Sequence, residues 1–127
     1  MGDEGELEKL LANEAELNRG LLSSVLLPYV RIGRESGSPI FTPEFSRLTN
    51  SGKIVVYLLS RKAASAMGVS NITESATPRE ISEATGISYG SVKPTVSDLA
   101  RKHVLVRTEG QYSFPSHLLL QARELVK

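Results

Sequence analysis

Apolar residues recur at helical spacing near the N-terminus and again in the middle of the chain. The first stripe predicts an amphipathic helix over residues 4–19, which Gly20 ends or bends. The second stripe predicts a long helix that begins at Thr49 or Ser51 and stops at Gly68. The first stripe consists of Leu7, Leu10, Leu11, Leu17, Leu21 and Leu22, and the second of Ile54, Val55, Leu58, Leu59, Ala63, Ala66 and Met67.

Two shorter helices joined by a tight turn are predicted further along the chain. Thr77 can cap the first helix, Pro78 suits its first position, and Glu80 can bond back to the cap backbone. Gly86 permits the left-handed backbone that ends a helix, and Ser88 can cap the next one. So short a turn makes the helices cross steeply. The apolar positions that pack this corner are Ile81, Ala84, Ile87, Val92, Val96 and Leu99.

A β-hairpin is predicted over residues 104–114, because two short runs of strand-forming residues flank a turn at Gly110. Ser116 can cap a last helix after it. Before the long central helix, residues 31–39 have a loop composition, and the pair Thr42-Pro43 predicts a short helical turn.

The turn and its apolar positions resemble the helix-turn-helix of prokaryotic and archaeal transcriptional regulators. With the hairpin that follows, the pattern is similar to a winged helix-turn-helix DNA-binding domain of the MarR/ArsR-like superfamily. The resemblance implies a mainly α fold with a small β-hairpin wing (α+β) and extra N- and C-terminal helices. It divides the chain into an N-terminal helical extension and loop (1–46), the winged helix-turn-helix (47–115) and a C-terminal helix (116–127), and it implies a small third strand at Ile72. The matching residues are Ala84, Gly86, Ile87, Ser88, Val92, Val96 and Leu99.

The chain departs from this pattern at two positions. His103 stands where these proteins often carry Gly, and we expect it at the edge of the core. Pro94 falls inside the second helix and cannot donate a hydrogen bond to Gly90. The second helix is therefore predicted either to be kinked or to begin nearer Ser91.

Composition favours one intracellular domain. A chain of 127 residues with 40% hydrophobic content can bury one core. It has no Cys, which excludes disulfides and thiol catalysis and fits a reducing compartment. Its acidic start is the opposite of a secretory signal, and the apolar run Leu21 to Ile32 is shorter than the roughly 18 residues that a membrane helix needs. We expect a cytoplasmic protein without a membrane span.

The net charge of +1 hides an asymmetry between the two ends. Residues 1–18 hold six acids and one lysine, a net charge of −5, whereas residues 19–127 hold fourteen Lys or Arg and eight acids, a net charge of +6. A basic body attracts polyanions, although a charge of this size is also ordinary for a solvated domain.

The outward face of the second helix is poor in side chains that read bases. Arg or Lys reads guanine and Asn or Gln reads adenine, yet this face offers only Arg101 and, on its flank, Lys93. We therefore expect phosphate contacts and DNA shape to supply most of the affinity. At 100° per residue the face consists of Gly90, Pro94, Ser97 and Arg101, flanked by Tyr89 and Lys93 on one side and by Ser91 and Asp98 on the other.

Candidate DNA contacts lie on the recognition helix, residues 88–102, and on the wing. Hydroxyls at the helix N-terminus would bind phosphate, the rest of the helix would border the major groove, and the wing would contact the neighbouring backbone or minor groove. Three of these residues could instead have simpler roles. Ser88 could act only as a helix cap, Tyr89 could pack on the turn, and Arg107 could stack on Tyr112. The candidates are Ser88, Tyr89, Ser91, Lys93, Ser97, Arg101, Lys102, Arg107 and Gln111.

The leucine-rich terminal helices predict a homodimer, in which two recognition helices read half-sites about one DNA turn apart. The alternative is that both helices pack on their own domain.

The sequence contains little that supports an enzymatic function. His103 and His117 are the only histidines and have no metal-ligand spacing, and Gly52-Lys53 lacks the other residues of a phosphate-binding loop. We expect a non-enzyme without cofactor or metal, whose partner is double-stranded DNA. The alternatives are a winged helix that binds protein, a replication or plasmid-maintenance factor, and a sensor with a ligand cleft beside the terminal helices.

Overall fold

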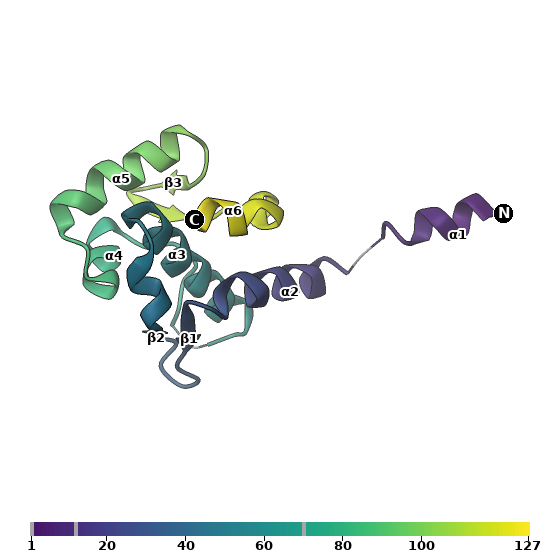
Figure 1. Ribbon diagram of the computed structural model, residues 1–127, viewed down its shortest axis with the longest axis horizontal. Coiled ribbons are helices and arrows are strands. Elements are labelled where there is room, and N and C mark those ends of the chain that lie inside the picture. The colour runs from purple at the N-terminus through teal and green to yellow at the C-terminus, as the bar shows by residue number, and fades with distance from the viewer. Residues whose placement is uncertain (1, 12, 70) are drawn as a thin grey trace.

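The computed structural model describes residues 2–11, 13–69 and 71–127, with side chains from residue 5 onward. Its centre is the helix α3, Asn50–Ala66, which confirms the long helix predicted there. Thr49 caps α3 through its hydroxyl, which accepts a hydrogen bond from the Gly52 amide at 3.1 Å. Residues 54–60 are all buried, because α2, α4, α5 and α6 pack around this helix (Figure 1). Over these residues α3 is buried on every side, and it serves as the scaffold for the other helices.

The helices α4, Pro78–Thr85, and α5, Tyr89–Arg101, confirm the predicted pair. The reciprocal cap is complete: the Thr77 hydroxyl accepts from the Glu80 amide at 3.2 Å, and the Glu80 carboxylate accepts from the Thr77 amide at 3.0 Å. Gly86 ends α4 with φ 80°, the left-handed conformation that glycine adopts without strain. Their buried residues, Ile81, Val92, Val96 and Leu99, join one core with α3.

The start of α5 differs from the prediction in two respects. Ser88 occupies the cap position, but its hydroxyl bonds to the Ser91 hydroxyl at 2.9 Å and makes no cap bond to the backbone. The helix begins at Tyr89, so a start nearer Ser91 was wrong, and Pro94 lies inside the helix. The first turn holds because the Ser91 and Val92 amides both donate to the Ser88 carbonyl.

The predicted C-terminal hairpin is present. The strands β3, Val106–Thr108, and β4, Gln111–Ser113, pair antiparallel, with Arg107 opposite Tyr112. The third pairing is made by Ala76, whose amide and carbonyl exchange hydrogen bonds of 2.9 and 2.8 Å with Tyr112. The expectation that Ile72 makes it was wrong, because the chain passes β4 only in the last residues before α4.

A second hairpin precedes α3, where a loop was predicted for residues 31–39. Val30–Ile32 (β1) and Pro39–Phe41 (β2) pair antiparallel, so only the turn between them is irregular. Tertiary packing explains the strands, since Val30 is buried and the Phe41 ring stacks on Phe45, with centroids 3.8 Å apart. The 3₁₀ helix η1, Pro43–Arg47, confirms the short turn of helix predicted there.

The N-terminal segment forms two helices, α1, Gly2–Glu8, and α2, Glu14–Leu26. The single helix predicted over 4–19 was wrong, because the Asn13 side chain caps α2 by accepting from the Glu16 amide at 3.1 Å. Gly20 neither ends nor visibly interrupts α2, since it lies within it. The apolar face of α2 packs on α3, whereas α1 extends away from the body (Figure 1).

The chain ends in the 3₁₀ helix η2, Ser116–Gln121, followed by α6, Ala122–Val126. Pro115 takes the cap position expected for Ser116. The α6 helix packs on α3 and η2 lies against α2, so α2 and the C-terminal segment contact their own domain, whereas α1 extends away from it (Figure 1). Within the described ranges, no helix is long and apolar enough to cross a membrane.

Candidate nucleic-acid interface

The outward face of α5 is the one that the helical wheel predicts. Val92 and Val96 are fully buried, whereas Gly90, Pro94, Ser97 and Arg101 are exposed. Of the flanking residues, Tyr89 and Lys93 are exposed and Ser91 and Asp98 are half-buried. The helix therefore presents a continuous solvent-facing surface next to the turn that follows α4.

Tyr89 connects the N-terminal ends of α4 and α5. The Arg79 guanidinium, on the first turn of α4, lies over the Tyr89 ring at 4.7 Å from its centroid, and the Lys93 ammonium lies 5.6 Å from the same centroid. Cations over an aromatic face are attracted by the ring quadrupole. Tyr89 thus packs at the turn, as one of its predicted roles supposes, and at the same time gathers two positive charges on the exposed surface.

Sequence reasoning missed Arg79. It belongs to α4, and only the steep crossing of the two helices brings it to the N-terminal end of α5. In the sequence, Arg79 is marked only by its position directly after Pro78 at the start of a helix, and this position does not indicate a contact with Tyr89, ten residues away.

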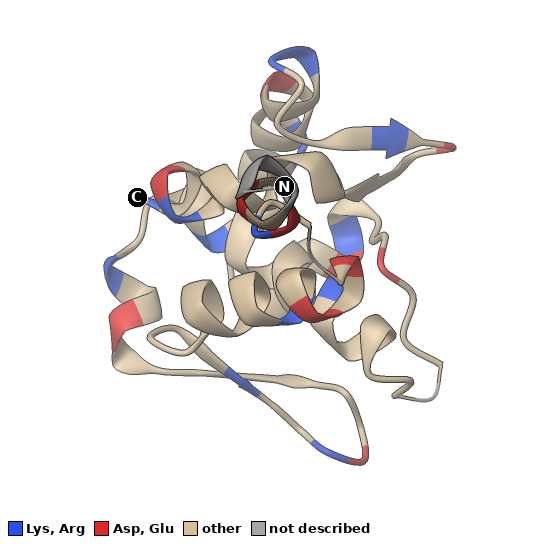
Figure 2. Ribbon diagram, turned by 90° about the vertical axis from the view of Figure 1, so that its right-hand side faces the viewer, with Lys and Arg blue, Asp and Glu red and all other residues tan. Residues whose placement is uncertain are grey.

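The C-terminal end of α5 carries a compact cluster of charges. Asp98 pairs with Arg101 at 3.2 Å and with Lys102 at 3.0 Å. The side chains of both cations remain largely exposed, at 76% and 66%. Exposed ion pairs contribute little energy, about 0–1 kcal/mol, so both cations stay available to a competing anion. In Figure 2, Lys and Arg colour both the end of the uppermost helix, α5, and the neighbouring strand β3.

The two wing candidates differ. Arg107 is exposed on β3, and no cation–π contact with Tyr112 joins it to the hairpin among the described residues. Gln111 is half-buried, and its side-chain carbonyl accepts a hydrogen bond of 2.7 Å from the Ser75 hydroxyl. Gln111 therefore fastens β4 to the connector, while Arg107 points its charge into solvent.

His103 is exposed, so its expected place at the core edge was wrong. It adopts φ 63°, the left-handed conformation in which a side chain other than glycine is strained. The backbone reverses here between α5 and β3, and glycine would adopt this conformation without strain.

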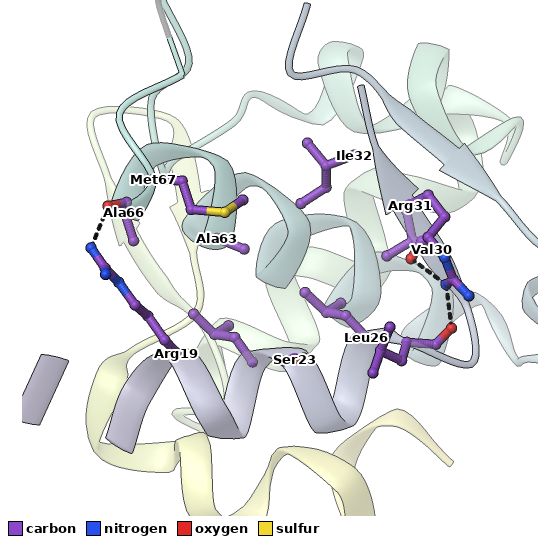
Figure 3. A pocket seen from close by; sticks show the side chains of 11 residues that line it. Arg19, Ser23, Leu26, Val30, Arg31, Ile32, Ala63, Ala66 and Met67 are labelled. Atoms are coloured by element: carbon purple, nitrogen blue, oxygen red, sulfur yellow. Dashed lines mark hydrogen bonds between the residues drawn. The ribbon is translucent and has the colours of Figure 1, made fainter. Parts of the chain in front are cut away.

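An apolar pocket lies away from the α5 face, between α2, β1 and the end of α3. Its volume is about 450 Å³, and Leu22, Leu26, Ala63 and Met67 are among its lining residues. Arg19 and Arg31 stand at its opposite ends (Figure 3). Across residues 5–11, 13–69 and 71–127, no group of three or more His, Cys, Asp or Glu residues could hold a metal ion.

Comparisons with protein-family models, with curated proteins and with solved structures find no match for this chain.

Proposed function

We propose that this chain is a cytoplasmic DNA-binding protein, a transcriptional regulator, in which α3, α4, α5 and the β3–β4 hairpin act as a winged helix-turn-helix. One observation carries the proposal. The helix α5 buries Val92 and Val96 and exposes its other side to solvent, and Lys93, Arg101 and Lys102 are exposed where a phosphate could reach them. A cationic, exposed helix held by a short turn is the arrangement that enters a major groove.

In this proposal α5 lies in the major groove and the wing lies beside it. The paired hydroxyls of Ser88 and Ser91 stand at the N-terminus of α5, where unpaired amides favour a phosphate. Ser97 lies on the central face, and Arg107 on the wing reaches the neighbouring backbone or minor groove. Tyr89 holds Arg79 close enough to add a further phosphate contact.

Affinity would come mainly from phosphates and DNA shape. Gly90 and Pro94 let the α5 backbone approach the DNA closely but carry no hydrogen-bonding code, and the face has no Asn or Gln to read adenine. A homodimer, also proposed, would place two such helices on half-sites about one helical turn apart.

Fluorescence anisotropy with a random duplex DNA at two salt concentrations tests the proposal. Each phosphate contact releases counterions, so the affinity must fall steeply as salt rises. Binding that is absent at low salt, or that does not change with salt, would overturn it.

One observation favours a second function, a winged helix that binds protein. Asp98 already neutralises part of the charge at the C-terminal end of α5, which weakens attraction to a polyanion. A protein-binding domain of this kind would show almost no DNA binding in the same titration. A replication or plasmid-maintenance factor would use the same DNA contacts and would differ only in the sites it occupies.

A further inference from the structure

The pocket beside α2 is an open, largely apolar groove with positive ends. Leu27 and Met67, which line it, are 53% and 57% exposed. Arg19 lies at one end of the groove and donates a hydrogen bond to the Ala66 carbonyl at 3.4 Å. Arg31 lies at the other end and donates to the Val30 carbonyl at 3.0 Å. Among the described residues that line it, none is acidic. Such a surface fits an apolar segment that carries negative charge.

Residues 2–11, which contain α1, form a segment that is both apolar and negatively charged. After α1 the turn continues, because the Leu10 amide donates to the Leu7 carbonyl at 2.9 Å and the Leu11 amide donates to the Glu8 carbonyl at 3.0 Å. The Leu10–Leu7 bond places Leu10 one turn after Leu7 on the same side, and Leu11 follows it directly, so the three leucines lie close together as in helices that dock in grooves. They are 61%, 78% and 78% exposed.

We propose that residues 2–11 of one copy dock in the α2–α3 groove of a second copy of this chain. The leucines would cover the exposed lining around Met67, and the acidic charge of the segment would face the arginines at the groove ends. Reciprocal exchange places each N-terminal segment on the other copy, which closes a two-fold dimer. The inference deepens the proposed homodimer and needs no DNA.

The arrangement within one copy favours a second copy as the partner. Figure 1 shows α1 beyond the N-terminal end of α2, on the side away from α3, so the segment leaves its own groove uncovered. Three leucines cover less than the roughly 800 Å² per partner of a standard interface, so we expect dimers that form and separate in the micromolar range.

Disulfide trapping tests this directly, because the chain has no native Cys. Leu10→Cys protein is mixed with Met67→Cys protein under mild oxidation and without DNA. Docking raises the local thiol concentration from micromolar to roughly millimolar. The yield of the mixed disulfide dimer should therefore be more than about tenfold higher than the yield from a control mixture of Leu10→Cys with Val106→Cys. Val106 is the matched control because it is exposed on β3, outside the groove.

A charge exchange checks the orientation. Arg19→Glu in the Met67→Cys protein should lower the yield of the mixed dimer several-fold, and Glu6→Arg with Glu8→Arg in the Leu10→Cys protein should restore it.

A yield of the mixed dimer no higher than that of the Val106→Cys control overturns the inference. So does a single-chain Leu10→Cys/Met67→Cys protein that closes an internal disulfide and stays monomeric. DNA binding measured by anisotropy on the unmodified protein is independent of these outcomes, so failure of one proposal is distinguishable from failure of the other.

Discussion

The guanidinium of Arg79 lies over the ring of Tyr89, 4.7 Å from its centroid. This contact joins the first turn of α4 to the first turn of α5 across the short connection that ends at Ser88. It also adds a cation from outside the recognition helix to the surface proposed to meet DNA.

Replacing Arg79 by Ala should weaken DNA binding on all sequences. If Arg79 contacts one phosphate, the slope of log affinity against log salt becomes shallower by about one unit. Arg47→Ala is the matched control, because Arg47 is exposed and pairs with Glu44 on η1, outside the proposed interface. Anisotropy across a salt series measures both variants, and equal slopes for Arg79→Ala and Arg47→Ala would exclude the contact.

Asp98→Asn should strengthen DNA binding. The change removes a negative charge and frees both Arg101 and Lys102, each of which pairs with Asp98. The gain should be about two- to fivefold at low salt, the range of an exposed ion pair. Glu124→Gln, which breaks an exposed pair with Lys127 on α6, is the control and should leave affinity unchanged. An affinity unchanged or lowered by Asp98→Asn would contradict the assignment of this end of α5 to DNA.

Gly52→Ala should destabilise the fold. A Cβ at Gly52 would lie 2.2 Å from the Val126 carbonyl oxygen, so α6 or α3 would have to move. Overpacking of this kind costs about 1–3 kcal/mol of unfolding free energy. Gly90→Ala is the contrasting variant, because a Cβ there meets nothing within 4 Å. It should raise the unfolding free energy by up to about 1 kcal/mol. Urea denaturation followed by circular dichroism compares the two, and equal stability of both variants would show that α6 does not pack closely on α3.

His103→Gly should stabilise the protein. The residue sits at φ 63° with its side chain exposed, so glycine relieves backbone strain at little loss of contact. The unfolding free energy should rise by about 0.5–1 kcal/mol, because the relief of about 1–2 kcal/mol is partly offset by the entropy of glycine in the unfolded chain. Lys102→Gly, at φ −82°, removes no strain and should be destabilising. A thermal melt in which His103→Gly falls below the parent protein would contradict this account.

Elements fixed by local signals could be predicted from the sequence. The start of α4 depends on Thr77 and Glu80, which bond to each other's backbone three residues apart, and its end depends on Gly86. The inward and outward faces of α5 follow from helical periodicity alone. These features need no knowledge of distant residues, which explains why they were predicted to within a residue or two.

Features that depend on distant contacts were missed. The β1–β2 hairpin contains Gly33 and Pro39, typical of loops, and its strands form because Val30 is buried and Phe41 stacks on Phe45. At the candidate interface, the position of Arg79 follows from the crossing of two helices. The Gln111 bond to Ser75 likewise joins residues 36 positions apart, and no local pattern encodes it.

The most direct measurement is the salt dependence of duplex DNA binding by a Lys93→Ala/Arg101→Ala double variant, compared with an Arg47→Ala/Arg123→Ala double variant of the same net charge. If the α5 face binds DNA, only the first pair lowers affinity on every sequence and reduces the salt slope by about two units. Equal affinities and slopes for the two double variants would contradict the assignment of the α5 face to DNA.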